Sequence, residues 1–298
     1  MRRGIKGNRL LFVPFLVEVY MKIYKVISID AEKIWGAKKI NKKVIGEVIK
    51  FEVNNQQSNY IEDDSKNIYS LYQLYISPQK EEFFGKKYLR RKQFPFLIKY
   101  IYSSKKLSLQ AHPKGKKETW LFLKDNSKIL LGLNKSIKKK NLNLDAILSN
   151  SNIITCNKYD FAAVNPGTIH SILENNIVCE VQNNYDVTYR YFDWDNNREL
   201  TQKEFVENAR FSKFNMRKNI YHNFKRFKSS NFKINKVNIK GEKYFGKKNC
   251  CQIVLVLNGN GTINIANKSL KVKKDETYFI LPYSDYAIFG NLDILIVF

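Results

Sequence analysis

The sequence predicts a mainly β protein built from two small β-barrels, with a few short helices. Short runs of β-branched and aromatic residues, interrupted by Gly, Asn, Asp and Pro, recur along most of the chain. Two stretches repeat the same order of features: a strand pair with a Gly-containing turn, a polar step and a short apolar turn containing Pro. At 298 residues and 44% hydrophobic content, the chain is long enough for two packed cores.

The expected strands share high β propensity and a turn-forming residue at one end. They are Val44–Val53, Leu107–Ala111, Thr119–Leu123, Ile129–Leu133, Ile177–Gln182, Ile253–Leu257, Thr262–Ile265, Tyr278–Leu281 and Leu292–Phe298.

Helical patterns are fewer and short. Ile68–Ser77 carries its apolar residues at the spacing of one helix face. Asn143–Ser149 is a second candidate. Thr201–Ala209 is a third, because Thr201 can cap the helix and Glu204 follows three residues later.

The repeated order suggests a duplicated barrel, and a basic polar segment separates the copies. We expect an N-terminal extension over residues 1–20, a metal-binding catalytic domain over 21–212, a basic linker over 213–231 and a C-terminal domain over 232–298. The C-terminal copy contains no histidine. We therefore expect it to be structural.

The formal charge of +25 invites a nucleic-acid interpretation. Lys greatly outnumbers Arg, however, and is spread along the whole chain together with abundant Asn and Ile. This distribution indicates a compositional drift and a favourable field for a small anionic substrate rather than a nucleic-acid partner. The apolar stretch from Leu10 to Val17 is too short to cross a membrane. We expect a cytoplasmic protein, monomeric or weakly dimeric, with no membrane partner.

Two of the only three histidines stand in segments suited to a metal site. Gln110 and His112 would face the same way on a strand, Glu118 follows six residues later, and His170 comes just after a Pro-Gly turn. Two imidazoles, one carboxylate and one amide oxygen suit a borderline divalent ion, with zinc first. A second interpretation stays open: each side chain serves a separate hydrogen bond in a polar barrel mouth.

Several segments, in the same order along the chain, resemble motifs of type I mannose-6-phosphate isomerases. These are Leu107–Pro113 (family LS-Q-HP), Gly115–Trp120 (GK-E-W), Pro166–Ile172 (P-GT-HAI) and Glu180–Trp194 (E-QQNSD-TYR-YDW), with Ile34–Gly36, Ile45–Glu47 and Phe94–Lys99 in family order. The resemblance spans about residues 22–298 and matches the short bacterial form.

The resemblance implies two cupin-type (jelly-roll) barrels and one Zn²⁺ per chain. Its ligands would be Gln110, His112, Glu118 and His170. The implied reaction is the aldose–ketose isomerisation of D-mannose 6-phosphate and D-fructose 6-phosphate through an enediolate.

The other site residues follow from the same motifs. Arg190 and Lys116 are expected to stabilise developing negative charge. Asp186 is the predicted proton carrier, with Glu180 as a competing choice and as a substrate contact. Trp35 is the second predicted substrate contact, although core packing explains it equally well.

One departure from the family motivates an alternative function. Only Lys114 separates His112-Pro113 from Gly115-Lys116, whereas the family has a longer loop between these two dipeptides. A sugar-phosphate-binding cupin without turnover therefore stays open. An iron-dependent oxygenase is less well supported, because its sites use histidine and carboxylate ligands rather than an amide such as Gln110.

Overall fold

The computed structural model describes residues 22–298, so the predicted extension at 1–20 lies outside the described residues. The chain divides into two compact units. Unit 1 contains residues 22–29, 50–95 and 225–298, and unit 2 contains residues 30–49 and 96–224. This division differs from the predicted one, in which each domain was a continuous segment. Strands near the N-terminus pair with C-terminal strands, and such non-local pairing leaves no local sequence signal.

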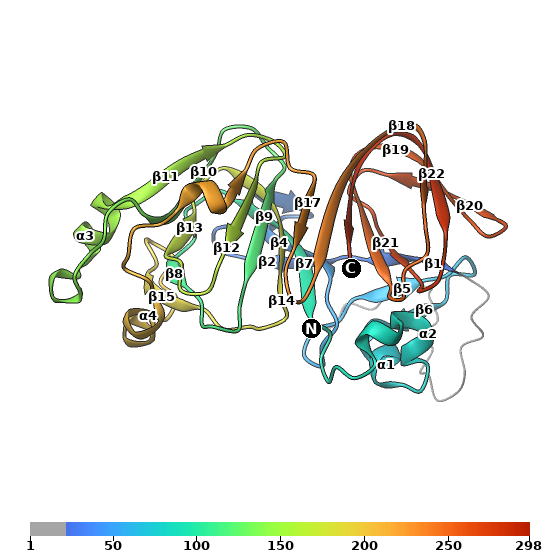
Figure 1. Ribbon diagram of the computed structural model, residues 1–298, viewed down its shortest axis with the longest axis horizontal. Coiled ribbons are helices and arrows are strands. Elements are labelled where there is room, and N and C mark those ends of the chain that lie inside the picture. The colour runs from blue at the N-terminus through green and yellow to red at the C-terminus, as the bar shows by residue number, and fades with distance from the viewer. Residues whose placement is uncertain (1–21) are drawn as a thin grey trace. The chain divides into compact units, whose positions relative to one another are not determined.

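Unit 1 is built on one nine-stranded antiparallel sheet (Figure 1). Its order is β17-β18-β22-β19-β21-β1-β5-β6, and β20 pairs with β19. The strands are β1 (Ile23–Ile27), β5 (Tyr60–Glu62), β6 (Ile68–Ser70), β17 (Arg226–Lys228), β18 (Lys233–Phe245), β19 (Gln252–Ile265), β20 (Lys268–Lys273), β21 (Thr277–Ile280) and β22 (Tyr286–Val297). Ile23 of β1 lies opposite Ile280 of β21, which explains why the first strand belongs to this unit.

Unit 2 contains two sheets. The five-stranded sheet has the order β11-β10-β13-β8-β15, and the eight-stranded sheet has the order β16-β12-β9-β14-β7-β4-β2, with β3 paired to β4. The strands of the first are β8 (Leu109–Ala111), β10 (Ser127–Leu133), β11 (Ser151–Cys156), β13 (His170–Ile172) and β15 (Tyr189–Phe192). Those of the second are β2 (Ile29–Glu32), β3 (Lys38–Ile40), β4 (Lys43–Phe51), β7 (Phe96–Ser103), β9 (Glu118–Phe122), β12 (Phe161–Val164), β14 (Asn176–Asn183) and β16 (Ile220–Tyr221).

The helices are short, as predicted. They are α1 (Leu71–Ile76), α2 (Lys80–Phe84), α3 (Leu144–Ser149) and α4 (Gln202–Asn208), with 3₁₀ turns at Lys86–Tyr88, Lys139–Asn141 and Met216–Lys218. The three predicted helices are confirmed in position, whereas α2 was not predicted. Helix α1 begins three residues later than expected, because Ile68–Ser70 pairs with β5 and Ser70 caps the helix.

One predicted turn in unit 1 is wrong. The segment Asn258–Gly261 was expected to separate two strands, but β19 continues through it for 14 residues. The ladder with β22 shifts register between Val256 and Asn258, the mark of a β-bulge. Gly259 has a φ of +79°, and an added Cβ would lie 2.0 Å from the carbonyl oxygen of Asn291. The glycine therefore permits a bulge inside the strand rather than a chain reversal.

The core of unit 2 lies between its two sheets. Trp120 and Phe122 of β9 pack in one cluster with Ile129 and Leu131 of β10. Trp35 belongs to the same cluster and is only 2% exposed. The ring of Trp35 is therefore packed in the core, the second of the two roles expected for it, and a substrate contact stays a prediction. No helix among residues 22–298 is long and apolar enough to cross a membrane.

Candidate metal centre

The five-stranded sheet of unit 2 aligns three polar side chains across adjacent strands. Gln110 on β8 lies directly opposite His170 on β13 and, on its other side, opposite Arg190 on β15. Residues opposite each other in an antiparallel ladder project from the same face. All three side chains therefore leave the sheet on one face.

The eight-stranded sheet contributes a second polar group. On β14, Gln182 lies opposite Glu118 of β9, and Glu180 lies opposite both Trp120 of β9 and Lys99 of β7. Glu180 and Gln182 are two residues apart on one strand, so they share a face with these partners. The polar side chains of the two sheets meet in the interior of unit 2.

A tight turn fixes both histidines. Gly167 has a φ of +76°, and its N–H donates to the carbonyl of His112 at 2.9 Å. An added Cβ at Gly167 would lie 2.8 Å from the carbonyl oxygen of Asn208, so a larger residue would disturb the turn. Because His170 begins the strand after this turn, the loop that ends in Gly167 positions both imidazoles.

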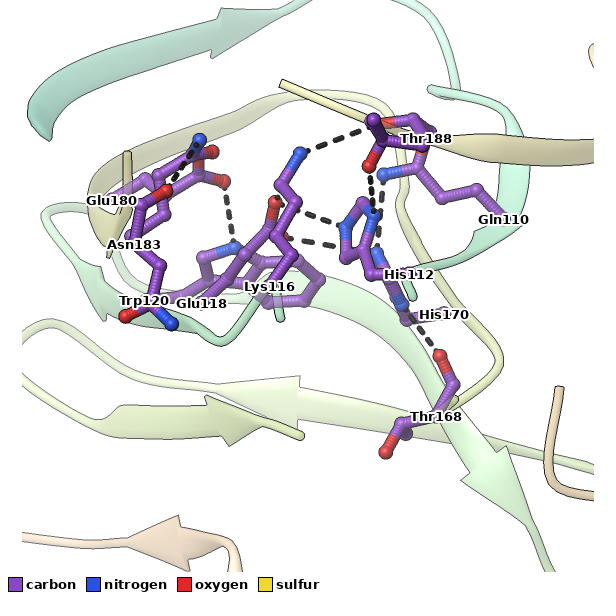
Figure 2. Close-up of polar contacts among 12 residues, drawn as sticks. Gln110, His112, Lys116, Glu118, Trp120, Thr168, His170, Glu180, Asn183 and Thr188 are labelled. Carbon is purple, nitrogen blue, oxygen red and sulfur yellow. Dashed lines mark hydrogen bonds and ion pairs between the residues drawn. The ribbon is translucent and has the colours of Figure 1, made fainter. Parts of the chain in front are cut away.

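His112, Glu118 and His170 form a buried cluster (Figure 2). One potential ligand atom from each lies within 4.8 Å of the others. Nε2 of His112 is 2.9 Å from Oε1 of Glu118, and Nε2 of His170 is 3.8 Å from Oε2. The predicted convergence of these three side chains is therefore present in the structure.

Hydrogen bonds orient both imidazole rings. Nδ1 of His170 lies 2.7 Å from the carbonyl of Thr168, and Nδ1 of His112 lies 3.3 Å from the carbonyl of Val187. A carbonyl can only accept, so each Nδ1 carries the proton and each Nε2 presents a lone pair to the cluster. Metal-binding histidines are commonly held by such a contact.

Both rings are neutral near pH 7. Burial, followed by the neighbouring His112, lowers the pKa of His170 to about 3. Burial also lowers the pKa of His112. By itself burial would raise the pKa of Glu118, but the Lys116 ammonium 3.2 Å away lowers that pKa and keeps the carboxyl ionised. The carboxylate is therefore charged beside two neutral rings.

This arrangement places two acceptors, Nε2 of His112 and Oε1 of Glu118, 2.9 Å apart without a proton between them. Among residues 22–298, Nε2 of His112 and Oε2 of Glu118 are buried and have no hydrogen-bond partner. Such unpaired buried atoms are costly unless a cation binds them. Imidazole nitrogens with a carboxylate oxygen are a common donor set for Zn²⁺. The residues therefore fit a divalent metal ion.

Gln110 lies at the edge of the cluster. Its amide nitrogen is 3.1 Å from Nε2 of His170, and its amide oxygen accepts from Ser108 Oγ at 2.7 Å. A metal ligand would have to be the oxygen, so the amide must turn over to bind an ion. The structure brings Gln110 to the cluster in an orientation suited to a hydrogen bond.

No family model matches the chain, but individual proteins do. The protein named "Probable mannose-6-phosphate isomerase GmuF" of Bacillus subtilis is 31% identical over 129 residues, covering 38% of this chain and 41% of that protein. The chain thus aligns with less than half of GmuF's length. Mannose-6-phosphate isomerase ManA of B. subtilis is 23% identical over 292 residues, covering 85% of this chain and 90% of ManA.

Solved structures show the same fold. The crystal structure of the mannose 6-phosphate isomerase from B. subtilis superposes with a TM-score of 0.81 at 22% identity, covering 93% of this chain and 100% of that one. A point mutant of phosphomannose isomerase from Salmonella typhimurium gives a TM-score of 0.79 at 14% identity, over 93% and 99% of the two chains. The chain is similar in sequence and in fold to proteins named mannose-6-phosphate isomerase. The predicted mainly β, cupin-type fold class is confirmed by this likeness.

The other residues predicted from the mannose-6-phosphate isomerase motifs differ from one another in how deeply they are buried. Lys116 is buried, and its Nζ lies 3.2 Å from both Glu118 Oε1 and Thr188 Oγ1. Arg190 is partly buried, and its Nε has no hydrogen-bond partner in the described part of the chain. Asp186 is exposed in the loop before β15 and does not enter the buried cluster.

Glu180 is buried in the interior of unit 2. It is 3% exposed, and one carboxylate oxygen accepts from the indole N–H of Trp120 at 2.9 Å. Burial and the charge of Glu118 raise the pKa of Glu180 to about 7. Glu180 can therefore exchange a proton near neutral pH.

Two residues that contact Glu180, Gln182 and Lys99, were not predicted from the sequence. With its amide nitrogen turned toward the carboxylates, Gln182 donates to Glu180 at 2.7 Å and to Glu118 at 3.2 Å. Lys99 Nζ lies 3.3 Å from Glu180. The two-residue spacing from Glu180 could have indicated Gln182. No local signal distinguishes Lys99 in so lysine-rich a chain.

Proposed function

We propose that the protein is a zinc-dependent aldose–ketose isomerase that interconverts D-mannose 6-phosphate and D-fructose 6-phosphate through an enediolate. The proposal rests on one observation. Neutral Nε2 atoms from two histidines and a charged glutamate carboxylate converge in a buried site within the fold of mannose-6-phosphate isomerases. The site's one-residue loop at Lys114 does not disturb this convergence.

His112, Glu118 and His170 would hold the ion, and Gln110 would complete the set after its amide turns. A bound zinc ion would act as a Lewis acid that polarises the sugar oxygens and orients the opened chain. Burial of the site excludes water and strengthens the electrostatic interactions inside it.

The protein's own cations would stabilise the negative charge that develops on the substrate oxygens. Lys116 lies beside Glu118 and can supply one fixed charge at the site. Arg190 projects from the same sheet face as Gln110 and His170. Its buried Nε has no partner among the described residues and can therefore donate to a ligand. A phosphorylated sugar is an anion, so both cations also favour its binding.

A proton must move between the two carbons of the opened sugar. Glu180 suits this task, because it is buried beside the cluster and its pKa lies at about 7. Asp186 stays a second candidate on the exposed loop before β15. Comparing the two variants distinguishes them, as described below.

We also propose a cytoplasmic location for the protein. The proposed function needs neither a nucleic acid nor a membrane. The high positive charge would then act only on the approach of the anionic sugar.

The test combines metal analysis with flux on purified protein. We expect about one zinc per chain, isomerisation of mannose 6-phosphate, and loss of flux after chelation that returns with zinc. His170→Ala should lose both metal and flux. His222→Ala is the matched control, because this exposed histidine pairs with Asp160 in the same unit, away from the cluster. Metal-dependent binding of the sugar phosphate without flux would instead support the alternative function, a sugar-phosphate-binding cupin without turnover.

A further inference from the structure

A chain of alternating charges crosses the eight-stranded sheet next to the metal centre. Lys33, after β2, lies 3.3 Å from one carboxylate oxygen of Glu47 on β4. The other oxygen of Glu47 accepts from Lys99 on β7 at 3.0 Å. Lys99 in turn lies 3.3 Å from Glu180 on β14.

The inner members of this chain are well shielded. The side chains of Glu180, Glu47 and Lys99 are 4%, 14% and 18% exposed, whereas Lys33 is 39% exposed. A buried ion pair persists only when good geometry offsets the cost of removing both charges from water. Lys99 meets this condition, because carboxylates contact it from two neighbouring strands.

The shifts in pKa agree with this mutual stabilisation. Burial by itself lowers the pKa of Lys99, but Glu180 and Glu47 hold it well above its usual range. Burial would likewise raise the pKa of Glu47, yet Lys99 and Lys33 hold it below its usual range. Both groups are therefore charged over the physiological range.

Lys99 has one donor left for a ligand. An ammonium carries three N–H groups. Among the described residues, only Glu47 and Glu180 lie within ion-pair distance of its Nζ. The Lys99 side chain is 18% exposed, so it is not fully enclosed by protein. A third donor is thus available on the sheet face that contributes to the site.

We propose that Glu47 is a positioning residue: it anchors Lys99 against Glu180, so that a fixed positive charge and a correctly placed Glu180 face the substrate. This inference rests on the proposed isomerase function. Glu47 itself would not contact the sugar. Its loss would leave Lys99 held by Glu180 alone and would free the ammonium to move, and small displacements of such groups are costly for catalysis.

Activity of Glu47→Gln tests the proposal. We expect kcat to fall on the order of tenfold to a hundredfold with zinc content unchanged and a smaller effect on KM. Glu47→Asp should recover part of kcat, because it restores the charge with a shorter reach. Lys33→Gln is the matched control: it removes the outer partner of Glu47 and should leave kcat near that of wild type.

The pH–rate profile adds a readout that a purely structural role would not move. The charged groups around Glu180 are Glu118, Lys99, Lys116 and Glu47. Those around Lys99 are the carboxylates of Glu180, Glu47 and Glu118. Removing the negative charge of Glu47 lowers the pKa of both Glu180 and Lys99. Both limbs of the profile should therefore move to lower pH in Glu47→Gln and not in Lys33→Gln.

Crystal structures of wild type and Glu47→Gln make the test independent of flux. Displacement of the Lys99 ammonium from Glu180 in the variant supports the proposal, even if wild type proves inactive and the proposed isomerase function fails. An unmoved Lys99, or a folded Glu47→Gln enzyme with the kcat and pH profile of wild type, overturns it. If Glu47→Gln does not fold, Glu47→Asp decides, because it keeps the charge but shortens the reach to Lys99: wild-type kcat in that variant with an unmoved Lys99 ammonium would also overturn the proposal.

Discussion

Gln110 and His170 lie directly opposite each other on neighbouring strands, and the amide nitrogen of Gln110 is 3.1 Å from Nε2 of His170. The amide thus caps the lone pair that His170 would give to a metal. A bound ion would replace this hydrogen bond and draw in the amide oxygen instead. The metal-free and metal-bound states should therefore differ in the orientation of one side chain.

Gln110→Ala should weaken zinc binding without unfolding the chain. The variant loses one ligand but keeps both imidazoles and Glu118, so we expect affinity to fall by about tenfold or more. Competition with a chelator of known affinity measures the change. Gln202→Ala is a suitable control, because this exposed glutamine lies on α4 and bonds only the carbonyl of Tyr191 among the described residues. Equal affinity in Gln110→Ala and wild type would exclude the amide as a ligand.

Glu180→Gln and Asp186→Asn should affect activity differently. Glu180 is buried with a pKa of about 7, so removing its charge should abolish the acidic limb of the kcat profile and reduce kcat by about a hundredfold or more. Asp186→Asn should retain most of the activity, because Asp186 is exposed. A larger loss in Asp186→Asn than in Glu180→Gln would assign the proton transfer to Asp186.

Acid should destabilise the metal-free protein through His170. Its pKa is about 3 when folded and near 6.5 when unfolded, so between these values the unfolded chain binds more protons. The free energy of unfolding should therefore rise with pH across this window, by on the order of 1 kcal/mol per pH unit from this group. Urea unfolding at several pH values measures the slope. His170→Gln should flatten it, and an unchanged slope in that variant would show that His170 is not held neutral.

Two glycines of unit 1 test the bulge in β19. Gly259 and Gly241 both have positive φ, but an added Cβ meets Asn291 at 2.0 Å in the first and nothing within 4 Å in the second. Gly241→Ala should lower the free energy of unfolding by about 1–2 kcal/mol from backbone strain alone. Gly259→Ala should cost at least about 3 kcal/mol, because the backbone must also move. Similar losses in the two variants, measured by urea unfolding followed by circular dichroism, would contradict the close approach.

The convergence of His112, Glu118 and His170 was predictable because two of these residues are rare histidines in distinctive segments. Gln110, His112, Glu118 and His170 stand in short motifs, and strand alternation and the Pro-Gly turn explain how they converge. The same local rules located the three helices and most central strands. They could not assign Trp35, since an aromatic residue beside a glycine suits a core and a pocket wall equally, and the structure places it in the core.

The pairing of strands that lie far apart in the chain could not be predicted from the sequence. Nothing in Ile23–Ile27 indicates that it pairs with Thr277–Ile280 more than 250 residues later, and the division into discontinuous units follows from such pairs. Lys99 was missed for a related reason. Lys99 is distinguished by its ion pairs with Glu47 and Glu180 on the two neighbouring strands. In a lysine-rich sequence, nothing near Lys99 indicates these partners.

The most direct test is a crystal structure of the purified protein with data collected on both sides of the zinc absorption edge. We expect one anomalous peak about 2.0–2.1 Å from Nε2 of both His112 and His170, touching a carboxylate oxygen of Glu118. Density for Gln110 should place its amide oxygen toward the peak. An active enzyme with no peak at this position, or with its metal bound elsewhere, would contradict the assignment of the site.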